Sequence, residues 1–338
     1  MARVVSIVNP VAGKAQGAKL RERALEELTR IFPESTFLYT SGPGHAIELA
    51  QSAADAELIV AVGGDGTVRE IVCGLMSANP DITTKAQRHK AEGMKPEMLN
   101  QERSAFGHSS FIPPPSSLPS LAVIPVGSCN DLPRNVGIPR DVIEACRVAK
   151  DGRPRPIDVI RVEMSDSSDA QQTYFANAAG FGFDAVVTTE AQKAKHLRGM
   201  LLYLVAIIRT LSHLECPLVR IRAGDFSAEQ RVLMVAAANG QYYGGGLKVA
   251  PEAKPDDGLI EVCIGWEMGW WSTLKKLPRF VAGTHVTLKE VKMLRGPELE
   301  LEFLEPVNVE LDGDVLSPQP FRRFRLTTLP GAISVRVA

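Results

Sequence analysis

Residues 58–70 read Leu-Ile-Val-Ala-Val-Gly-Gly-Asp-Gly-Thr-Val-Arg-Glu, and this stretch decides the fold of the chain. Its first five residues are apolar and rich in β-branched side chains, which is typical of a strand buried on both faces. Three glycines follow at positions 63, 64 and 66, with Asp65 set among them, and a helical pattern begins at Val68. The stretch therefore predicts a strand, a glycine turn and the start of a helix.

The turn of this unit has the chemistry of a phosphate site. Glycine lets the backbone approach a ligand closely, and the free N–H groups of a helix N-terminus attract an anion. Asp65 by itself would repel a phosphate, but it fits a site in which a divalent cation lies between the carboxylate and the phosphate. The turn thus indicates a Mg²⁺–nucleotide site. The alternative is a plain strand-to-helix turn in which Asp65 caps the helix.

The composition is that of an ordinary globular protein. The chain has 338 residues and a formal net charge of -1, so two domains are expected and a nucleic-acid partner is not. Its five cysteines are scattered, which favours reduced thiols in a cytoplasmic protein. The first residues show no signal-peptide pattern. The longest apolar run, residues 200–208, is too short to span a bilayer, which leaves peripheral contact with a membrane.

The first half of the chain repeats the strand–turn–helix pattern. Further strands are expected at residues 4–8, 34–39 and 121–125. Such repeats predict an α/β fold with a doubly wound parallel sheet, which binds ligands at the carboxyl ends of its strands. Residues 77–120 break the rhythm with mixed charges and a run of prolines, and we interpret them as a mobile insertion.

The second half alternates apolar and polar residues, which predicts an antiparallel sheet or sandwich. Two helical stretches interrupt it, at residues 185–210 and 270–282. Both carry basic residues, and the second begins with Trp270 and Trp271, a combination that suits a membrane–water interface. Two ordinary amphipathic helices packed on the sheet are the alternative.

Five stretches taken together resemble the diacylglycerol kinase catalytic-domain superfamily, which includes bacterial YegS-like lipid kinases and the sphingosine and ceramide kinases. They are residues 9–13, 63–70, 124–134, 180–184 and 244–258. Asp312-Gly313-Asp314 resembles the closing Asp-Gly-Glu of that family. The Gly-Gly-Asp-Gly-Thr motif alone is shared with NAD kinases, but its combination with the Ile-Pro-x-Gly-Ser-x-Asn-Asp stretch is specific. The resemblance covers nearly the whole chain outside the insertion.

This resemblance implies two domains, with ATP and a lipid meeting between them. A nucleotide-binding α/β domain of the NAD kinase and diacylglycerol kinase type would comprise residues 1–155 and a returning segment, 324–338. An antiparallel β-sandwich domain for the lipid substrate would comprise residues 156–323. The residues implied to contact ATP are Asn9, Pro10, Gly13, Thr40, Gly63, Gly64, Asp65, Gly66, Thr67, Glu70, Ser128 and Asn130.

The resemblance also implies two Mg²⁺ sites. The acidic network around the catalytic ion would be made by three aspartates: Asp65, Asp131 and Asp158. Asp257, with backbone carbonyls near Lys254 and Leu259, corresponds to a second, structural site. Judged by its spacing alone, Asp257 belongs to an ordinary Asp-Gly turn.

Three residues of the motifs depart from the family pattern. Arg69 stands where the family usually has asparagine, and it adds a cation near the phosphates. Ser128 replaces threonine and keeps the hydroxyl group. Asp314 falls where the family places its general base, but it replaces glutamate and is one methylene shorter, which limits its reach to a substrate hydroxyl.

The expected function is that of an ATP- and Mg²⁺-dependent lipid kinase that phosphorylates a hydroxyl of a membrane lipid, such as diacylglycerol or a sphingoid base. Asp314 and Asp65 would be its catalytic residues. Two alternatives stand beside it: a catalytically impaired lipid-binding or regulatory protein on the same scaffold, and an NAD kinase. A monomer and a homodimer both fit the sequence.

Overall fold

The structure is a computed structural model that describes residues 3–79, 118–166, 170–193, 199–211 and 216–338. Its first part is a parallel sheet, with its strands in the order β2-β1-β3-β4. These strands are β1 (Val4–Val8), β2 (Thr36–Tyr39), β3 (Leu58–Gly63) and β4 (Ser120–Pro125). Every residue of β3 is buried, as its continuous apolar run predicts.

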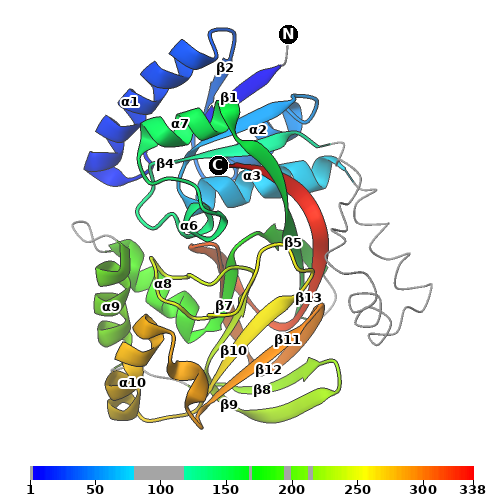
Figure 1. The fold of residues 1–338 in the computed structure, drawn as a ribbon. Helices are drawn as coiled ribbons and strands as arrows, with labels where there is room; N and C mark the ends of the chain where they lie inside the picture. Colours follow the sequence, from blue (N-terminus) through cyan, green and yellow to red (C-terminus); the bar gives the residue numbers. More distant parts are fainter. Residues whose placement is uncertain (1–2, 80–117, 167–169, 194–198, 212–215) are drawn as a thin grey trace, which may run out of the picture.

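Helices cover both faces of this sheet (Figure 1). Helices α1 (Lys14–Ile31) and α7 (Val142–Asp151) pack against each other, as do α2 (His45–Ser52) and α3 (Asp65–Ala78). The short helix α6 (Asp131–Val136) follows β4. A single apolar core joins these helices to the sheet, so the first part has the predicted doubly wound α/β architecture.

The second part is built from long antiparallel strands. They are β5 (Arg153–Ser165), β6 (Ala170–Phe175), β7 (Ala178–Gly182), β8 (Leu218–Ala223), β9 (Phe226–Ala238), β10 (Ile260–Trp266), β11 (Val291–Gly296), β12 (Glu298–Leu311) and β13 (Asp314–Val337). Phe175, Phe181 and Phe303 are fully buried among them. The alternation in the sequence therefore becomes a sheet-rich domain with its own core.

Strands β5 and β13 join the two parts. They pair with each other over most of their lengths, and Val335 of β13 pairs in parallel with Leu121 of β4. The chain thus ends in the first sheet (Figure 1). The domain boundaries proposed at residues 155 and 323 fall inside these two strands and stay predictions.

Three helices pack on one face of the second part: α8 (Phe183–Lys193), α9 (Gly199–Thr210) and α10 (Trp270–Ala282). The predicted stretch 185–210 therefore contains two helices. A short 3₁₀ helix, His285–Thr287, follows α10. In the described part of the chain, no helix combines the length and the apolar character that a bilayer span needs. Of the predicted insertion 77–120, α3 takes the first two residues and β4 the last, and residues 80–117 lie outside the described residues.

Candidate active site

Three turns meet at the carboxyl ends of β1, β3 and β4. Gly13 has a positive φ of 73°, and a Cβ atom there would overlap the carbonyl oxygen of Val126. A Cβ on Gly127 would likewise overlap the Cα of Gly64. Only glycine permits such close backbone packing. The predicted glycine turns therefore lie directly side by side next to the N-terminus of α3, and a helix N-terminus attracts an anion.

Asp65, which is partly buried, and the buried Asp131 place two carboxylates at this edge of the sheet. Asp65 Oδ1 accepts a hydrogen bond from the backbone N of Leu132 at 3.1 Å, so it contacts the start of α6 rather than capping its own helix. Asp131 Oδ2 accepts one from Gly245 N at 2.7 Å. Burial raises the pKa of both carboxyls, and the charge of Asp65 helps to raise the pKa of Asp131 to about 7.

This pair fits the Mg²⁺ that the family implies. Asp131 Oδ1 is buried and has no hydrogen-bond partner among the described residues. Two mutually repelling carboxylates with an unused oxygen match a cation that is usually held by one or two carboxylates together with substrate phosphates and water. Within the described residues no group of three potential metal-ligating side chains forms, so phosphate and water would complete the shell.

Other residues predicted to bind ATP shape the same turns. Asn9 Nδ2 donates to Thr67 Oγ1 at 2.9 Å. Asn130 has a left-handed backbone, and its Oδ1 accepts from Gly127 N at 3.1 Å. The backbone N of Thr40 donates to the carbonyl of Val8 at 2.9 Å. These contacts hold the turns in position, whereas Pro10 is exposed.

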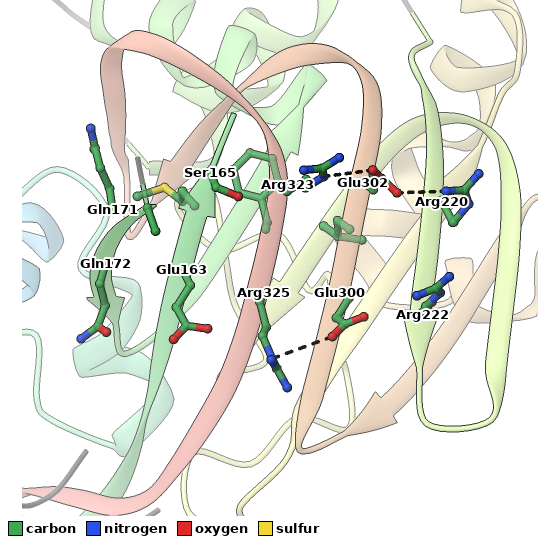
Figure 2. Close-up of a pocket in the computed structure, with 14 residues that line it drawn as sticks. Glu163, Ser165, Gln171, Gln172, Arg220, Arg222, Glu300, Glu302, Arg323 and Arg325 are labelled. Carbon is green, nitrogen blue, oxygen red and sulfur yellow. Dashed lines mark hydrogen bonds and ion pairs between the residues drawn. The ribbon is translucent and has the colours of Figure 1, made fainter. Parts of the chain in front are cut away.

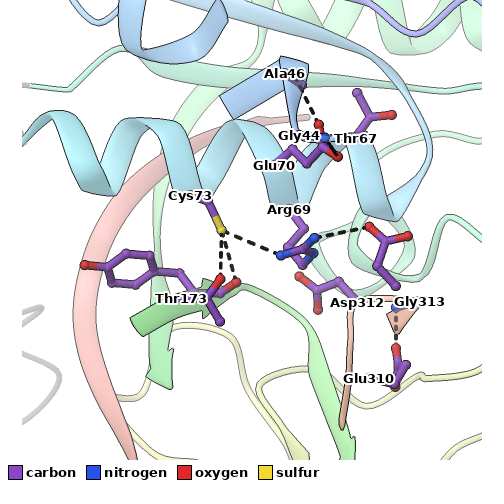
Figure 3. Close-up of polar contacts among 12 residues, drawn as sticks. Gly44, Ala46, Thr67, Arg69, Glu70, Cys73, Thr173, Glu310, Asp312 and Gly313 are labelled. Atoms are coloured by element: carbon purple, nitrogen blue, oxygen red, sulfur yellow. Dashed lines mark hydrogen bonds and ion pairs between the residues drawn. The ribbon is translucent and has the colours of Figure 1, made fainter. Parts of the chain in front are cut away.

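Glu70 of α3 contacts the start of α2. Its two carboxylate oxygens accept from Gly44 N at 2.7 Å and from Ala46 N at 3.1 Å (Figure 3). A negative group at a helix N-terminus accepts hydrogen bonds from free N–H groups, and it interacts favourably with the positive end of the helix dipole. Glu70 therefore links α3 to α2 in the first part of the molecule.

The Asp312-Gly313-Asp314 turn between β12 and β13 reaches this edge from the second part. Asp312 has a φ of 48°, and its carboxylate accepts from the backbone N–H groups of residues 176, 177 and 178 at 2.8 to 3.0 Å. Burial raises its pKa to about 6. A Cβ on Gly66 would lie 2.5 Å from Asp314 Oδ2. The Asp314 carboxylate thus lies against the first turn of α3.

Two residues that the sequence analysis missed support the Asp312-Gly313-Asp314 turn: Glu310 and Tyr243. The fully buried Glu310 accepts a hydrogen bond from the hydroxyl of Tyr243. It accepts a second from Gly313 N (Figure 3). Burial raises the pKa of Glu310 well above its usual value. The sequence carried no signal for it, because Glu310 takes a polar position in the alternating stretch 307–311.

A cavity of about 190 Å³ opens between these elements. Its walls combine Asp65, Gly66, Ser128 and Asp131 of the first part with Asn177, Thr188, Leu202, Tyr203, Tyr243, Asp312 and Gly313 of the second. The structure therefore gathers the glycine turn, the acidic pair and the closing turn around one space. Its far wall comes from α8 and α9.

Asp158 and Asp257 belong to a different cluster. Asp158 accepts from Gly258 N at 2.6 Å and from Gly331 N at 2.8 Å. Its pKa rises to about 6 because of burial, and the charge of Asp257 adds to that rise. The structure thus does not bring Asp158 to Asp65.

Asp257 itself is engaged by other groups. Its Oδ1 accepts from Leu259 N at 3.0 Å, and Arg295 forms an ion pair with Oδ2. A guanidinium beside the carboxylate does not match the donor set of a cation site. The second Mg²⁺ site, with Lys254 and Leu259, stays a prediction.

A larger cavity of about 490 Å³ lies away from all predicted site residues, on the outer face of β5, β6, β8, β12 and β13 (Figure 2). Charged side chains cross it in pairs, such as Arg323 with Glu302 at 3.0 Å and Arg220 with Glu302 at 2.9 Å. These pairs are exposed, and each contributes little to stability. We interpret this groove as a solvated sheet face.

Comparison with known proteins agrees with this architecture. Residues 3–162 match the family described as diacylglycerol kinase catalytic domain, and residues 177–337 match the YegS C-terminal NAD kinase beta sandwich-like domain. A protein of Stenotrophomonas maltophilia named "Probable lipid kinase YegS-like" is 32% identical over 65% of this chain and 70% of its own length. One of the same name from Pectobacterium atrosepticum is 26% identical over 96% of this chain and 93% of its own.

A solved structure extends the likeness to the whole fold. The crystal structure of a diacylglycerol kinase from Bacillus anthracis aligns with a TM-score of 0.64 at 22% identity, covering 100% of this chain and 97% of that one. At that sequence identity, the match supports the fold alone. The predicted fold class, an α/β domain followed by a sandwich-like β domain, is confirmed.

Proposed function

This chain belongs to the family of YegS-like lipid kinases, and from that premise we propose that it transfers the γ-phosphoryl group of ATP to a hydroxyl of a membrane lipid such as diacylglycerol or a sphingoid base. One observation carries the proposal: Asp314 of the second part lies against Gly66, at the N-terminus of α3. A carboxylate thereby stands beside a phosphate-binding turn and a cavity.

The residues have separate parts in the transfer. The lipid hydroxyl oxygen attacks the γ-phosphorus and forms the new P–O bond, while the bond to the β,γ-bridging oxygen breaks and ADP leaves with its electrons. Asp314 accepts the hydroxyl proton. The N–H groups of the glycine turn orient the phosphates. A Mg²⁺ held by Asp65 and Asp131 would supply neutralising charge on the phosphate oxygens.

The direct test is transfer of labelled γ-phosphate from ATP, with Mg²⁺, to separate mixed micelles of diacylglycerol, monoacylglycerol, sphingosine, ceramide and phosphatidylglycerol. We expect one labelled lipid, which would also identify the acceptor. Labelled NAD in a parallel reaction would favour the NAD kinase alternative instead. ATP binding that is weak or absent, with no labelled product, would overturn the proposal in favour of a lipid-binding protein.

We further propose that α9 and α10 dock on the membrane that holds the substrate. Trp270 and Trp271 stack with ring centroids 3.8 Å apart and are 46% and 60% exposed. Leu201 and Ile208 of α9 are also more than half exposed. Neither helix contains an acidic residue, and Lys275 is exposed on α10. Aromatic rings beside cations suit an anionic membrane interface.

Replacing both Trp270 and Trp271 by alanine should weaken binding to anionic vesicles by about 10- to 100-fold, because two large apolar side chains no longer enter the interface. Sedimentation with vesicles of phosphatidylglycerol and phosphatidylcholine measures the effect. Leu304→Ala is a matched control, because Leu304 is 65% exposed but lies on β12. Equal binding by the double variant and the parent would place the membrane contact elsewhere.

A further inference from the structure

Arg69 is a buried cation at the junction of the two parts of the molecule. It lies on α3 and is 7% exposed. Its Nη2 is 3.4 Å from Asp314 Oδ2, and its Nη1 is 3.9 Å from Cys73 Sγ (Figure 3). The sulfur of Cys73 in turn contacts the backbone carbonyl of Tyr174 at 3.4 Å. The guanidinium therefore lies between α3 and the strands of the second part.

A buried guanidinium needs a counter-charge. Burial lowers the pKa of Arg69, but the neighbouring Cys73 and three carboxylates raise it by more: Asp314, Asp312 and Glu70. Asp312 is engaged by three backbone N–H groups, and Glu70 by the start of α2. Asp314 makes its hydrogen bond to Arg69 and to no other group within the described residues. The carboxylate of Asp314 is thus the direct partner of this cation.

The two partners are also two of the three departures from the motifs. Where the family resemblance leads one to expect asparagine and glutamate, this chain has Arg69 and Asp314. The carboxylate is one methylene shorter, and the side chain facing it is longer and charged. Gly66 leaves little space on the other side of the carboxylate, since a Cβ there would lie 2.5 Å from it. The changes are complementary in length and in charge.

We propose that Arg69 is the positioning residue of Asp314, and that the pair works as one matched unit. The guanidinium holds the shorter carboxylate against the first turn of α3, beside the cavity that would take the lipid hydroxyl. This inference rests on the proposed function, because it assigns Arg69 a part in the same transfer. Arg69 itself touches neither proton nor phosphate in this role.

A double-mutant cycle tests the pair through R69N, D314E and the combined variant. R69N should lower kcat by about 10- to 100-fold and leave the KM for ATP within about threefold, because the base is released but the phosphate turn is intact. D314E should also lower kcat, since the longer acid meets Arg69 and Gly66. The combined variant should be more active than either single one, with a coupling of about tenfold or more.

If the loss of kcat in the combined variant equalled the product of the losses in R69N and D314E, the pairing would be overturned. An increased KM for ATP with unchanged kcat in R69N would overturn it too, because Arg69 would then be a phosphate ligand. R161Q is the matched control: Arg161 is 6% exposed and pairs with Glu163 at 3.7 Å. It should lower Tm without changing kcat, which separates loss of a buried arginine from loss of positioning.

The cycle also distinguishes this inference from the proposed function. A parent protein that labels no lipid and binds ATP weakly or not at all would overturn the proposed function and the role of the pair with it. An active parent with uncoupled variants would overturn the inference alone. A D314E variant that is more active than the parent would contradict the matched pair directly and would favour an impaired kinase.

Discussion

Replacing Asp314 by asparagine should lower kcat for lipid phosphorylation by about 10²- to 10⁴-fold, the usual contribution of a positioned general base. Asparagine has the same size, so the contact with Gly66 is preserved, but its amide cannot accept the hydroxyl proton. The KM for ATP should change little, because asparagine keeps the contact with Gly66 and leaves the glycine turn undisturbed. Initial rates at saturating ATP and lipid measure the effect.

A matched control separates this chemistry from the loss of an ion pair. Asp256 pairs with Arg155 at 2.6 Å, and its side chain is 36% exposed, close to the 39% of Asp314. Asp256→Asn should therefore leave kcat unchanged and alter stability by about 1 kcal/mol or less. Full activity in Asp314→Asn would mean that another group accepts the proton.

Most of the fold could be predicted because its strands carry strong local signals. The apolar run of β3 and the glycines after it specify a buried strand and a tight turn without help from the rest of the chain. The alternation in the second half likewise specifies antiparallel strands. What the sequence did not predict is the length of β12, a single strand from Glu298 to Leu311.

The candidate site could be predicted only where its residues follow strand ends. Asp65 and Asp131 begin the helices that follow β3 and β4, and neighbouring parallel strands bring their carboxyl ends together. Asp158 lies inside the long strand β5, and hydrogen bonds to Gly258 and Gly331 place it in another cluster. The pairing of strands distant in sequence decides that placement, and no local pattern reports it.

The contacts of Arg69 and Glu310 were beyond sequence analysis for the same reason. Arg69 meets an acid 245 positions further along the chain, and Glu310 meets Tyr243 across 67 positions. Arg69 was visible only as an unusual charge in the motif, and Glu310 looked like an ordinary polar residue of an alternating strand. The partners that make those charges tolerable appear once the sheets are assembled.

Asp65→Asn should lower kcat by about 10³-fold or more, because several kcal/mol of charge stabilisation on the phosphates would be lost with the metal. The variant should remain folded, since the amide oxygen can still accept from Leu132 N. Mg²⁺ with ATP should raise the Tm of the parent and raise that of the variant much less. Thermal unfolding with and without Mg²⁺–ATP measures this independently of turnover.

Asp158→Asn decides whether the acidic network has two members or three. Asp158 is 1% exposed, and its carboxylate accepts from the backbone N–H groups of residues 258 and 331. We expect this variant to have a lower Tm and an unchanged Mg²⁺–ATP shift, because its partners lie outside the cavity. If Mg²⁺–ATP raised the Tm of Asp158→Asn as little as that of Asp65→Asn, Asp158 would belong to the metal site as its third aspartate. An Asp65→Asn shift in Tm equal to that of the parent would remove the metal from the Asp65–Asp131 pair.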